Sequence, residues 1–318
     1  MTEPSLTIEG FIDRFIALYQ QGAYDQALHL IQTSGSRFPE HNAMLLAWQS
    51  AMLSRLGRAE EAMQVLATAD AQGYWYHERA LQNDPDFESL RSNPNFSSLA
   101  ERMAARRLAA TESLRPEVQV TAPAGHDPHP LFLVLHGNSS NNLMTAPLWQ
   151  PVVEQGWMLA ALQSSQPSWT NGLYVWNDVD KALAEVQAQL SDLANQYPID
   201  PQAIVAGGFS MGAHVAVRMA LHPAFHLRGV VVMEAWFDEE GMAALEQAVN
   251  AAAPSQTRVL LMAGQENTEY ATMAQKVHDL LAAKGFTSKV VLSSNAQHTY
   301  PTEFAQLLKE GITWVLQG

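Results

Sequence analysis

The chain has 318 residues, of which 47% are hydrophobic and 16% charged, so it can bury a large core and is unlike a disordered chain. At about 150 residues per domain, this length predicts two domains or one large one. Its 18 basic and 32 acidic residues give a net charge of −14, which disfavours nucleic acid and anionic membrane surfaces as partners. The basic cluster of Arg102, Arg106 and Arg107 is too small for a nucleic-acid footprint. The absence of cysteine excludes disulfides, thiolate zinc sites and a cysteine nucleophile.

Residues 1–10 lack the basic and apolar regions of a secretory signal, and no apolar run approaches the roughly 20 residues that span a bilayer. We therefore expect a cytoplasmic protein without a membrane span. His126 and His129 are interpreted as linker residues, because no further ligands accompany them at metal-binding spacing. Neither a metal nor a cofactor is expected.

Residues 1–110 are predicted to form a helical domain that contains an internal repeat. Segments 22–31 and 57–66 align at an offset of 35 residues, so that a glycine and an alanine recur at matching positions. Glycine suits a turn between antiparallel helices, and alanine lets the helices pack closely. Over roughly residues 7–105 this region resembles tetratricopeptide repeats, whose period is about 34 residues. The resemblance implies a packing or docking role, including a protein or peptide partner; an ordinary helical bundle is the alternative.

Residues 111–318 alternate between apolar strands and amphipathic helices, and they are predicted to form a second domain. Such alternation over about 200 residues favours a parallel sheet with right-handed crossovers. The expected strands are 118–120, 131–135, 157–162, 203–206, 229–233, 259–262 and 289–292. The expected helices are 180–197, 211–221, 271–284 and 302–316.

The run Gly208-Phe209-Ser210-Met211-Gly212 follows an expected strand and precedes an expected helix. This G-x-S-x-G pattern is typical of a strained turn that lifts a serine hydroxyl above a sheet; the alternative is a glycine-rich turn with an incidental serine. Together with Leu135-His136-Gly137-Asn138 and Ile199-Asp200-Pro201, it resembles the α/β-hydrolase superfamily over roughly residues 115–318. The small esterases are most similar, namely the phospholipase/carboxylesterase, acyl-protein thioesterase and dienelactone-hydrolase-like groups. The resemblance implies an α/β-hydrolase fold, with a mostly parallel sheet flanked by helices.

The resemblance also implies a catalytic triad in the chain order serine, acid, histidine. Ser210 matches the nucleophile. His298 occupies the position of the base, in the loop between the strand 289–292 and the last helix. His278 lies on an expected helix and is interpreted as a helix-face residue, and His214, one turn after Ser210, is interpreted as helix surface or pocket wall.

The acid is the position at which the sequence departs from the family pattern, which usually places Asp three residues after the glycine that ends a strand. Gly264 is that glycine here, and it puts Asn267 at the expected place. Glu266 is predicted to be the acid, because its longer side chain could reach back to the imidazole. The alternatives are Asn267, Glu269 and Asp238.

The oxyanion hole is predicted to use the backbone N–H of Met211 and that of Asn138, with Gly137 allowing a close approach of the backbone. Aromatic residues in loops near the serine favour an apolar acyl or alkyl pocket. These residues are Trp169, Tyr174, Trp176, Trp236 and Phe237.

The leading hypothesis is a serine hydrolase that cleaves carboxylic esters or thioesters through an acyl-enzyme, acting on a small-molecule or acyl ester substrate. One alternative is a scaffold, in which the repeats bind a partner and the hydrolase domain is weak or silent because Asn267 replaces the acid. Another is a serine peptidase of the prolyl-oligopeptidase type.

Overall fold

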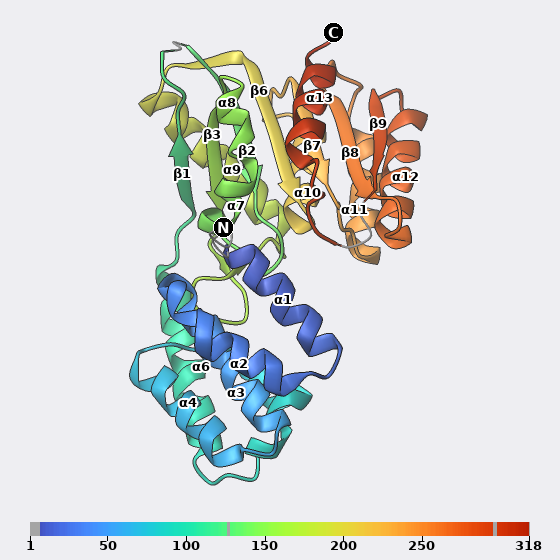
Figure 1. The fold of residues 1–318 in the computed structure, drawn as a ribbon. Coiled ribbons are helices and arrows are strands. Elements are labelled where there is room, and N and C mark those ends of the chain that lie inside the picture. The colour runs from blue at the N-terminus through green and yellow to red at the C-terminus, as the bar shows by residue number, and fades with distance from the viewer. Residues whose placement is uncertain (1–6, 126–127, 295–297, 318) are drawn as a thin grey trace. The chain divides into compact units, whose positions relative to one another are not determined.

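The computed structural model describes residues 7–125, 128–294 and 298–317 (Figure 1). The chain forms two compact units. The helical unit comprises Met1–Leu114 together with Pro167–Leu173, and the sheet unit comprises Arg115–Gln166 together with Tyr174–Gly318. The sequence predicts a division at residue 110 and gives no indication that 167–173 joins the helical unit.

The helical unit contains two helix pairs that turn in the same way. Gly22 and Gly57, which follow the first helix of each pair, have φ of +70° and +74°. At both turns the residue after the glycine donates its backbone N–H, at 2.9 Å, to the carbonyl five residues earlier, which is the Schellman arrangement. Ala27 and Ala62 are fully buried. The 35-residue offset therefore repeats a helix–turn–helix geometry. The helices are α1 (Ile8–Gln20), α2 (Tyr24–Ser34), α3 (Asn42–Arg55), α4 (Ala59–Ala71), α5 (Glu78–Asn83) and α6 (Phe96–Ser113).

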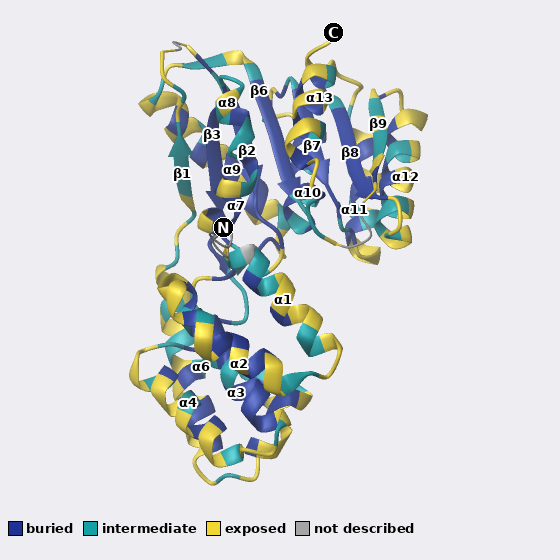
Figure 2. Ribbon diagram, in the orientation of Figure 1, coloured by how far each residue is buried: buried dark blue, intermediate teal, exposed yellow. Residues whose placement is uncertain are grey.

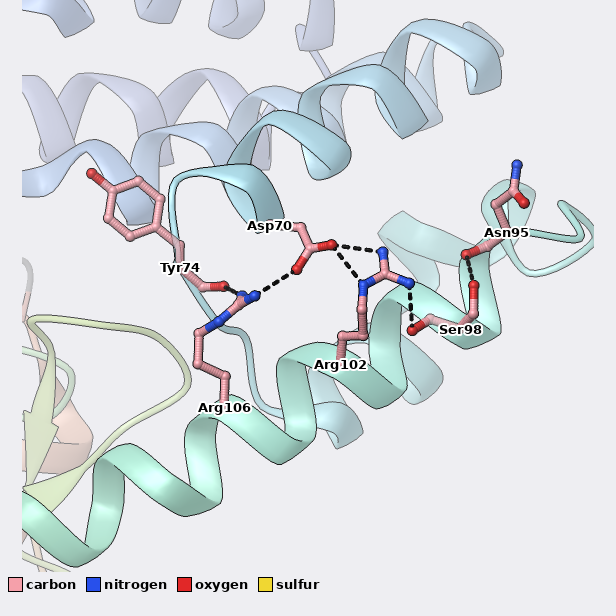
Figure 3. A network of polar contacts seen from close by, with 6 residues as sticks. All are labelled: Asp70, Tyr74, Asn95, Ser98, Arg102 and Arg106. Carbon is pink, nitrogen blue, oxygen red and sulfur yellow. Dashed lines mark hydrogen bonds and ion pairs between the residues drawn. The ribbon is translucent and has the colours of Figure 1, made fainter.

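Ion pairs tie α6 to the rest of the helical unit. Asp70, at the end of α4, accepts hydrogen bonds from Arg102 and Arg106 on α6 at 2.6–2.9 Å (Figure 3). Burial raises the pKa of Asp70, but the two guanidinium groups outweigh it and hold the pKa below its ordinary value. Arg107 pairs with Glu78 at 2.9 Å. Each arginine of the basic cluster is thus paired with an acid inside its own unit.

The sheet unit is built on a seven-stranded sheet in the order β1-β3-β2-β6-β7-β8-β9. β1 runs antiparallel to β3, and the other neighbours are parallel. β4 and β5 form a separate two-stranded sheet. The strands are β1 (Glu117–Thr121), β2 (His129–Leu135), β3 (Met158–Gln163), β4 (Gln166–Pro167), β5 (Tyr174–Val175), β6 (Ile199–Phe209), β7 (Gly229–Met233), β8 (Arg258–Gly264) and β9 (Ser288–Ser293).

Helices cover both faces of this sheet (Figure 2). Because the central strands are buried on both faces, their sequences are continuous apolar runs. Side chains of one group of helices pack on one face, and those of another group pack on the opposite face. The first group is α9 (Val179–Gln196), α10 (Met211–Leu221), α11 (Glu239–Ala251) and α12 (Thr268–Ala283). The second group is α7 (Asn142–Trp149), α8 (Pro151–Glu154) and α13 (Phe304–Leu316).

The expected strands and helices of this unit all correspond to observed elements, and β7 and α10 have the predicted bounds. Four further features were not expected from the sequence, namely α7, α8, α11 and the β4–β5 pair. No helix within the described residues is long and apolar enough to cross a membrane.

Candidate active site

Ser210 lies at the turn between β6 and α10, with φ of +54° and ψ of −117°. The glycines on either side have no room for a side chain. A Cβ on Gly208 would lie 2.5 Å from the backbone of Gly212, and one on Gly212 would lie 2.3 Å from the carbonyl oxygen of Leu135. The turn at Ser210 therefore requires glycine at both ends of the G-x-S-x-G pattern, and it holds the serine in a strained conformation.

His298 reaches this serine from the far end of the chain. Its Nε2 lies 3.0 Å from the Oγ of Ser210, which is hydrogen-bonding distance. The imidazole also packs on the ring of Tyr270, with centroids 4.1 Å apart, and on Phe209 at 4.7 Å. These rings restrict the orientation of the imidazole, so that its edge stays directed at the serine hydroxyl.

A buried carboxylate lies on the other side of the imidazole, and it belongs to Glu234. Its Oε2 is 3.8 Å from Nδ1 of His298, within ion-pair distance but longer than a hydrogen bond. Its Oε1 accepts a hydrogen bond of 2.7 Å from the N–H of Gly264. Glu234 is fully buried, and Oε2 has no hydrogen-bond partner among the described residues. A buried carboxylate oxygen left open toward an imidazole is typical of a functional site.

The neighbouring strands explain how Glu234 reaches this place. β6 and β7 pair in parallel, and their last residues, Phe209 and Met233, lie opposite each other. Ser210 and Glu234 are the residues that directly follow these two strands. Glu234 also has a positive φ, +51°, so both strands end in an unusual turn. Ser210, Glu234 and His298 follow one another in the order serine, carboxylate, histidine along the chain.

The residues predicted as the acid lie elsewhere. Glu266 and Glu269 are exposed, and Asn267 is half-buried just before α12. Asp238 accepts a hydrogen bond of 2.7 Å from the N–H of Gly241 and so caps α11. The prediction of Glu266 followed the family's usual Gly-x-x-Asp pattern, which does not lead to Glu234. The available signal was a glutamate directly after the strand that follows the serine turn.

The loop after β2 lies beside the serine. A Cβ on Gly137 would be 3.7 Å from the Cβ of Ser210. His136 is fully buried, and Nε2 of its ring accepts the N–H of Ser164 while Nδ1 donates to the carbonyl of Gly137 at 2.7 Å. Burial lowers the pKa of His136 to about 4, so its imidazole is neutral at pH 7 and stiffens the loop. Asn138 follows Gly137, and Met211 begins α10; their roles as oxyanion donors remain predictions.

The aromatic residues expected around the serine have different surroundings. Trp176 and Phe237 are buried, and Tyr174 is half-buried. Trp169 belongs to the helical unit. Trp236 is half-buried, 5.6 Å from the ring of Tyr270. Tyr270, which contacts His298, was not predicted.

Of the two histidines interpreted as linker residues, the structure describes His129. His129 begins β2, and its N–H donates to the carbonyl of Pro198 at 2.7 Å. His126 lies outside the described residues. Within those residues, no group of three or more His, Asp or Glu side chains is arranged to hold a metal ion.

His214, one turn after the serine, packs on Phe237 with ring centroids 4.2 Å apart. Its Nε2 is buried and has no hydrogen-bond partner among the described residues. Burial, together with the charge of Arg218, lowers the pKa of His214 to about 4. The imidazole is therefore neutral in the folded protein at pH values where the unfolded chain binds a proton.

His214→Gln is expected to make stability less sensitive to acid. Between pH 6.5 and about 4 the unfolded wild type binds a proton at this position that the folded state does not, so its unfolding free energy falls as the pH falls. The variant lacks this loss, which amounts to ~1.4 kcal/mol per pH unit. Urea denaturation of both proteins at pH 7, 6 and 5 measures it. Parallel pH profiles of the two unfolding free energies would contradict the prediction.

Two family models match the chain, one for each region. Residues 7–111 match the A/B hydrolase-like N-terminal domain, so the likeness to tetratricopeptide repeats stays a prediction. Residues 126–314 match the phospholipase/carboxylesterase family. The chain has no sequence match among curated proteins.

Solved structures support the same fold. An uncharacterised protein of Bacillus cereus ATCC 10987 is 24% identical, with 97% of this chain and 98% of that chain covered and a TM-score of 0.52. Esterase PE8 is 17% identical, with 64% and 100% covered and a TM-score of 0.54. The carboxylesterase of Bacillus cereus is 19% identical, with 65% and 98% covered and a TM-score of 0.50. At these identities the likeness concerns the fold. Because its own family match spans more than half of the chain, this protein belongs to the phospholipase/carboxylesterase family of α/β-hydrolase ester hydrolases.

Proposed function

We propose that this protein hydrolyses carboxylic esters or thioesters through an acyl-enzyme, with Ser210 as nucleophile, His298 as general base and Glu234 as the acid of the triad. The observation that carries the proposal is the 3.0 Å contact between Oγ of the strained serine and Nε2 of the histidine. Membership of an ester-hydrolase family supports the reaction class. Glu234 replaces Glu266 in the proposed triad, because its carboxylate is the one that lies against the imidazole.

In the proposed reaction, Nε2 of His298 takes the hydroxyl proton as Oγ of Ser210 attacks the carbonyl carbon. The N–H groups of Met211 and Asn138 stabilise the negative charge on the tetrahedral oxygen. The imidazolium then gives its proton to the departing alcohol or thiol. Water, deprotonated by the same nitrogen, hydrolyses the acyl-enzyme and restores the serine.

Glu234 stabilises the imidazolium that forms in each half of this reaction. Its carboxylate and Nδ1 are 3.8 Å apart, and hydrogen bonds of this kind often shorten only when substrate binds. The ring of Tyr270 packs on the base, and the ring of Trp236 lies 5.6 Å from that of Tyr270, which favours substrates with an apolar group at this side.

A fluorophosphonate probe tests the proposal. Wild type is expected to be labelled, Ser210→Ala to be unlabelled, and His298→Ala to be labelled at least ~100-fold more slowly, because a general base contributes 10²–10⁴-fold. Ser92→Ala, an exposed serine of the helical unit, is the matched control and should label as wild type does. An unlabelled wild type, or equal labelling of Ser210→Ala, would overturn the proposal.

The scaffold hypothesis rested on Asn267 in place of the acid, and Glu234 beside His298 removes that argument. If wild type turns over p-nitrophenyl butyrate and His298→Ala does not, a silent hydrolase is excluded. No observation favours a peptidase of the prolyl-oligopeptidase type over an esterase.

A further inference from the structure

One segment lies inside the hydrolase region of the sequence but folds with the helical unit. Residues Pro167–Leu173 belong to the compact unit formed by Met1–Leu114, although they fall within the stretch 126–314 that matches the esterase family. The chain leaves the sheet unit after Gln166 and returns to it at Tyr174. The two units are therefore joined covalently at this segment as well as at residues 114–115.

Main-chain pairing holds segment 167–173 in the helical unit. Tyr76 and Thr170 form an antiparallel β-bridge, and the N–H of His77 donates to the carbonyl of Trp169 at 2.7 Å. The hydroxyl of Thr170, which is fully buried, donates to the carbonyl of Trp75 at 3.0 Å. The segment is thus joined to the helical unit by one β-bridge and its adjoining hydrogen bonds.

A side chain completes this pairing. Oδ1 of Asn171 accepts the backbone N–H of Trp75 at 2.7 Å. Gly172, with φ of +76°, lets the chain turn back, and the N–H of Leu173 donates to the carbonyl of Thr170 at 3.4 Å. Asn171 and Thr170 together satisfy both backbone groups of Trp75.

The partner residues 75–77 are themselves held by the rest of the helical unit. Arg106 on α6 donates to the carbonyl of Tyr74, the residue before them, and also pairs with Asp70 (Figure 3). The hydroxyl of Tyr76, a residue only 1% exposed, donates to the carbonyl of Ala43 on α3 at 2.8 Å. The anchor of segment 167–173 is therefore part of the core of the helical unit.

The residues that follow the segment hold the predicted oxyanion loop in the sheet unit. Tyr174 and Ser140 exchange both backbone hydrogen bonds, at 2.9 and 3.3 Å. The indole N–H of Trp176 donates to the carbonyl of His136 at 2.9 Å. Residues 174–176 therefore contact both ends of the loop 136–140, which contains Gly137 and Asn138.

We infer that the helical unit positions the oxyanion loop of the active site, by anchoring segment 167–173 and, through it, residues 174–176. Thr170 and Asn171 are positioning residues for catalysis, acting through Tyr174 and Ser140. This inference rests on the proposed esterase function. It assigns the helical unit a task inside the enzyme, without a separate partner.

The inference predicts a change in kcat rather than in substrate binding. Oxyanion donors contact the charge that develops in the transition state, and loss of one such donor costs 10²–10³-fold in kcat. Displacing the oxyanion loop without removing its N–H groups should lower kcat by less than the loss of a donor does. The double variant Thr170→Val/Asn171→Ala removes both side-chain bonds to Trp75 and keeps similar volume at the buried threonine.

The experiment compares p-nitrophenyl butyrate hydrolysis by full-length variants. The double variant is expected to lose ~10-fold in kcat with KM unchanged within about twofold, whereas Asn171→Asp, which keeps an acceptor for the Trp75 N–H, should approach wild type. Ser50→Ala is the matched control, because it also deletes a fully buried hydroxyl of the helical unit that donates to a carbonyl at 3.0 Å. It should keep the wild-type kcat.

Two outcomes would overturn the inference: a wild-type kcat in the double variant, or an equal loss in Ser50→Ala, which would mean that general loosening of the unit is sufficient. Thermal melting of each variant accompanies the kinetics, and Asn171→Ala alone serves if the double variant does not fold. An inactive wild type would contradict the proposed function instead, so the two failures are distinguishable.

Discussion

Glu234→Gln is expected to lower kcat for ester hydrolysis by about 10⁴-fold, the loss that follows when the acid of a serine triad becomes an amide. Gln has the shape of Glu, and its Oε1 can still accept the N–H of Gly264, so the fold should be kept. Its amide nitrogen carries no charge to stabilise the imidazolium. As a donor facing Nδ1 of His298, it also favours the tautomer whose Nε2 cannot take the serine proton.

Glu266→Gln is the matched control, because it makes the same chemical change at an exposed glutamate two residues after Gly264. Its kcat should stay within about twofold of wild type, because this side chain is exposed. Its fold should also be kept, since surface substitutions rarely change the free energy of unfolding by more than about 0.5 kcal/mol. Initial rates with p-nitrophenyl butyrate and melting curves for both variants give the comparison. If Glu266→Gln lost most of its kcat while Glu234→Gln stayed active, the acid of the triad would be Glu266, in the loop after β8.

This pair of variants marks the point at which the sequence was no longer sufficient to predict the site. Ser210 and His298 could be placed because their neighbours in the sequence, two glycines and a strand–loop–helix passage, are local signals. The carboxylate beside the imidazole depends on the register between strands, because Glu234 reaches His298 only when Met233 pairs with Phe209. The end of β8 still contributes, because the N–H of Gly264 donates to the carboxylate of Glu234.

The elements of the fold that could be predicted are likewise those with local sequence signals, and the unpredicted ones include a segment that depends on long-range contacts. The strands from β2 to β9 that form the sheet could be predicted because continuous apolar runs have few alternatives. The helix α11 was missed although Asp238 caps it and Glu239 and Glu240 follow. No local pattern could place Pro167–Leu173 with the helical unit, because its partners, residues 75–77, lie about 95 positions earlier.

Gly212→Ala is expected to destabilise the protein by ~3 kcal/mol, although alanine favours a helix by roughly 1 kcal/mol over glycine. The new Cβ would lie 2.3 Å from the carbonyl oxygen of Leu135 and 2.4 Å from that of His136. Both contacts are with backbone at the end of a buried strand, which cannot rotate away as a side chain can. The overlap therefore outweighs the helical preference, and α10 must move away from β2.

That movement should also impair catalysis, because it separates Met211, at the start of α10, from the loop that begins at His136. Gly35→Ala is the matched control: Gly35 has φ of −62° and ψ of −33°, and an added Cβ would meet only side chains, at 3.5 Å or more. Urea denaturation should show a large loss for Gly212→Ala and none for Gly35→Ala. Equal unfolding free energies would mean that β2 and α10 are not held in contact, and the steric account of the serine turn would then fail.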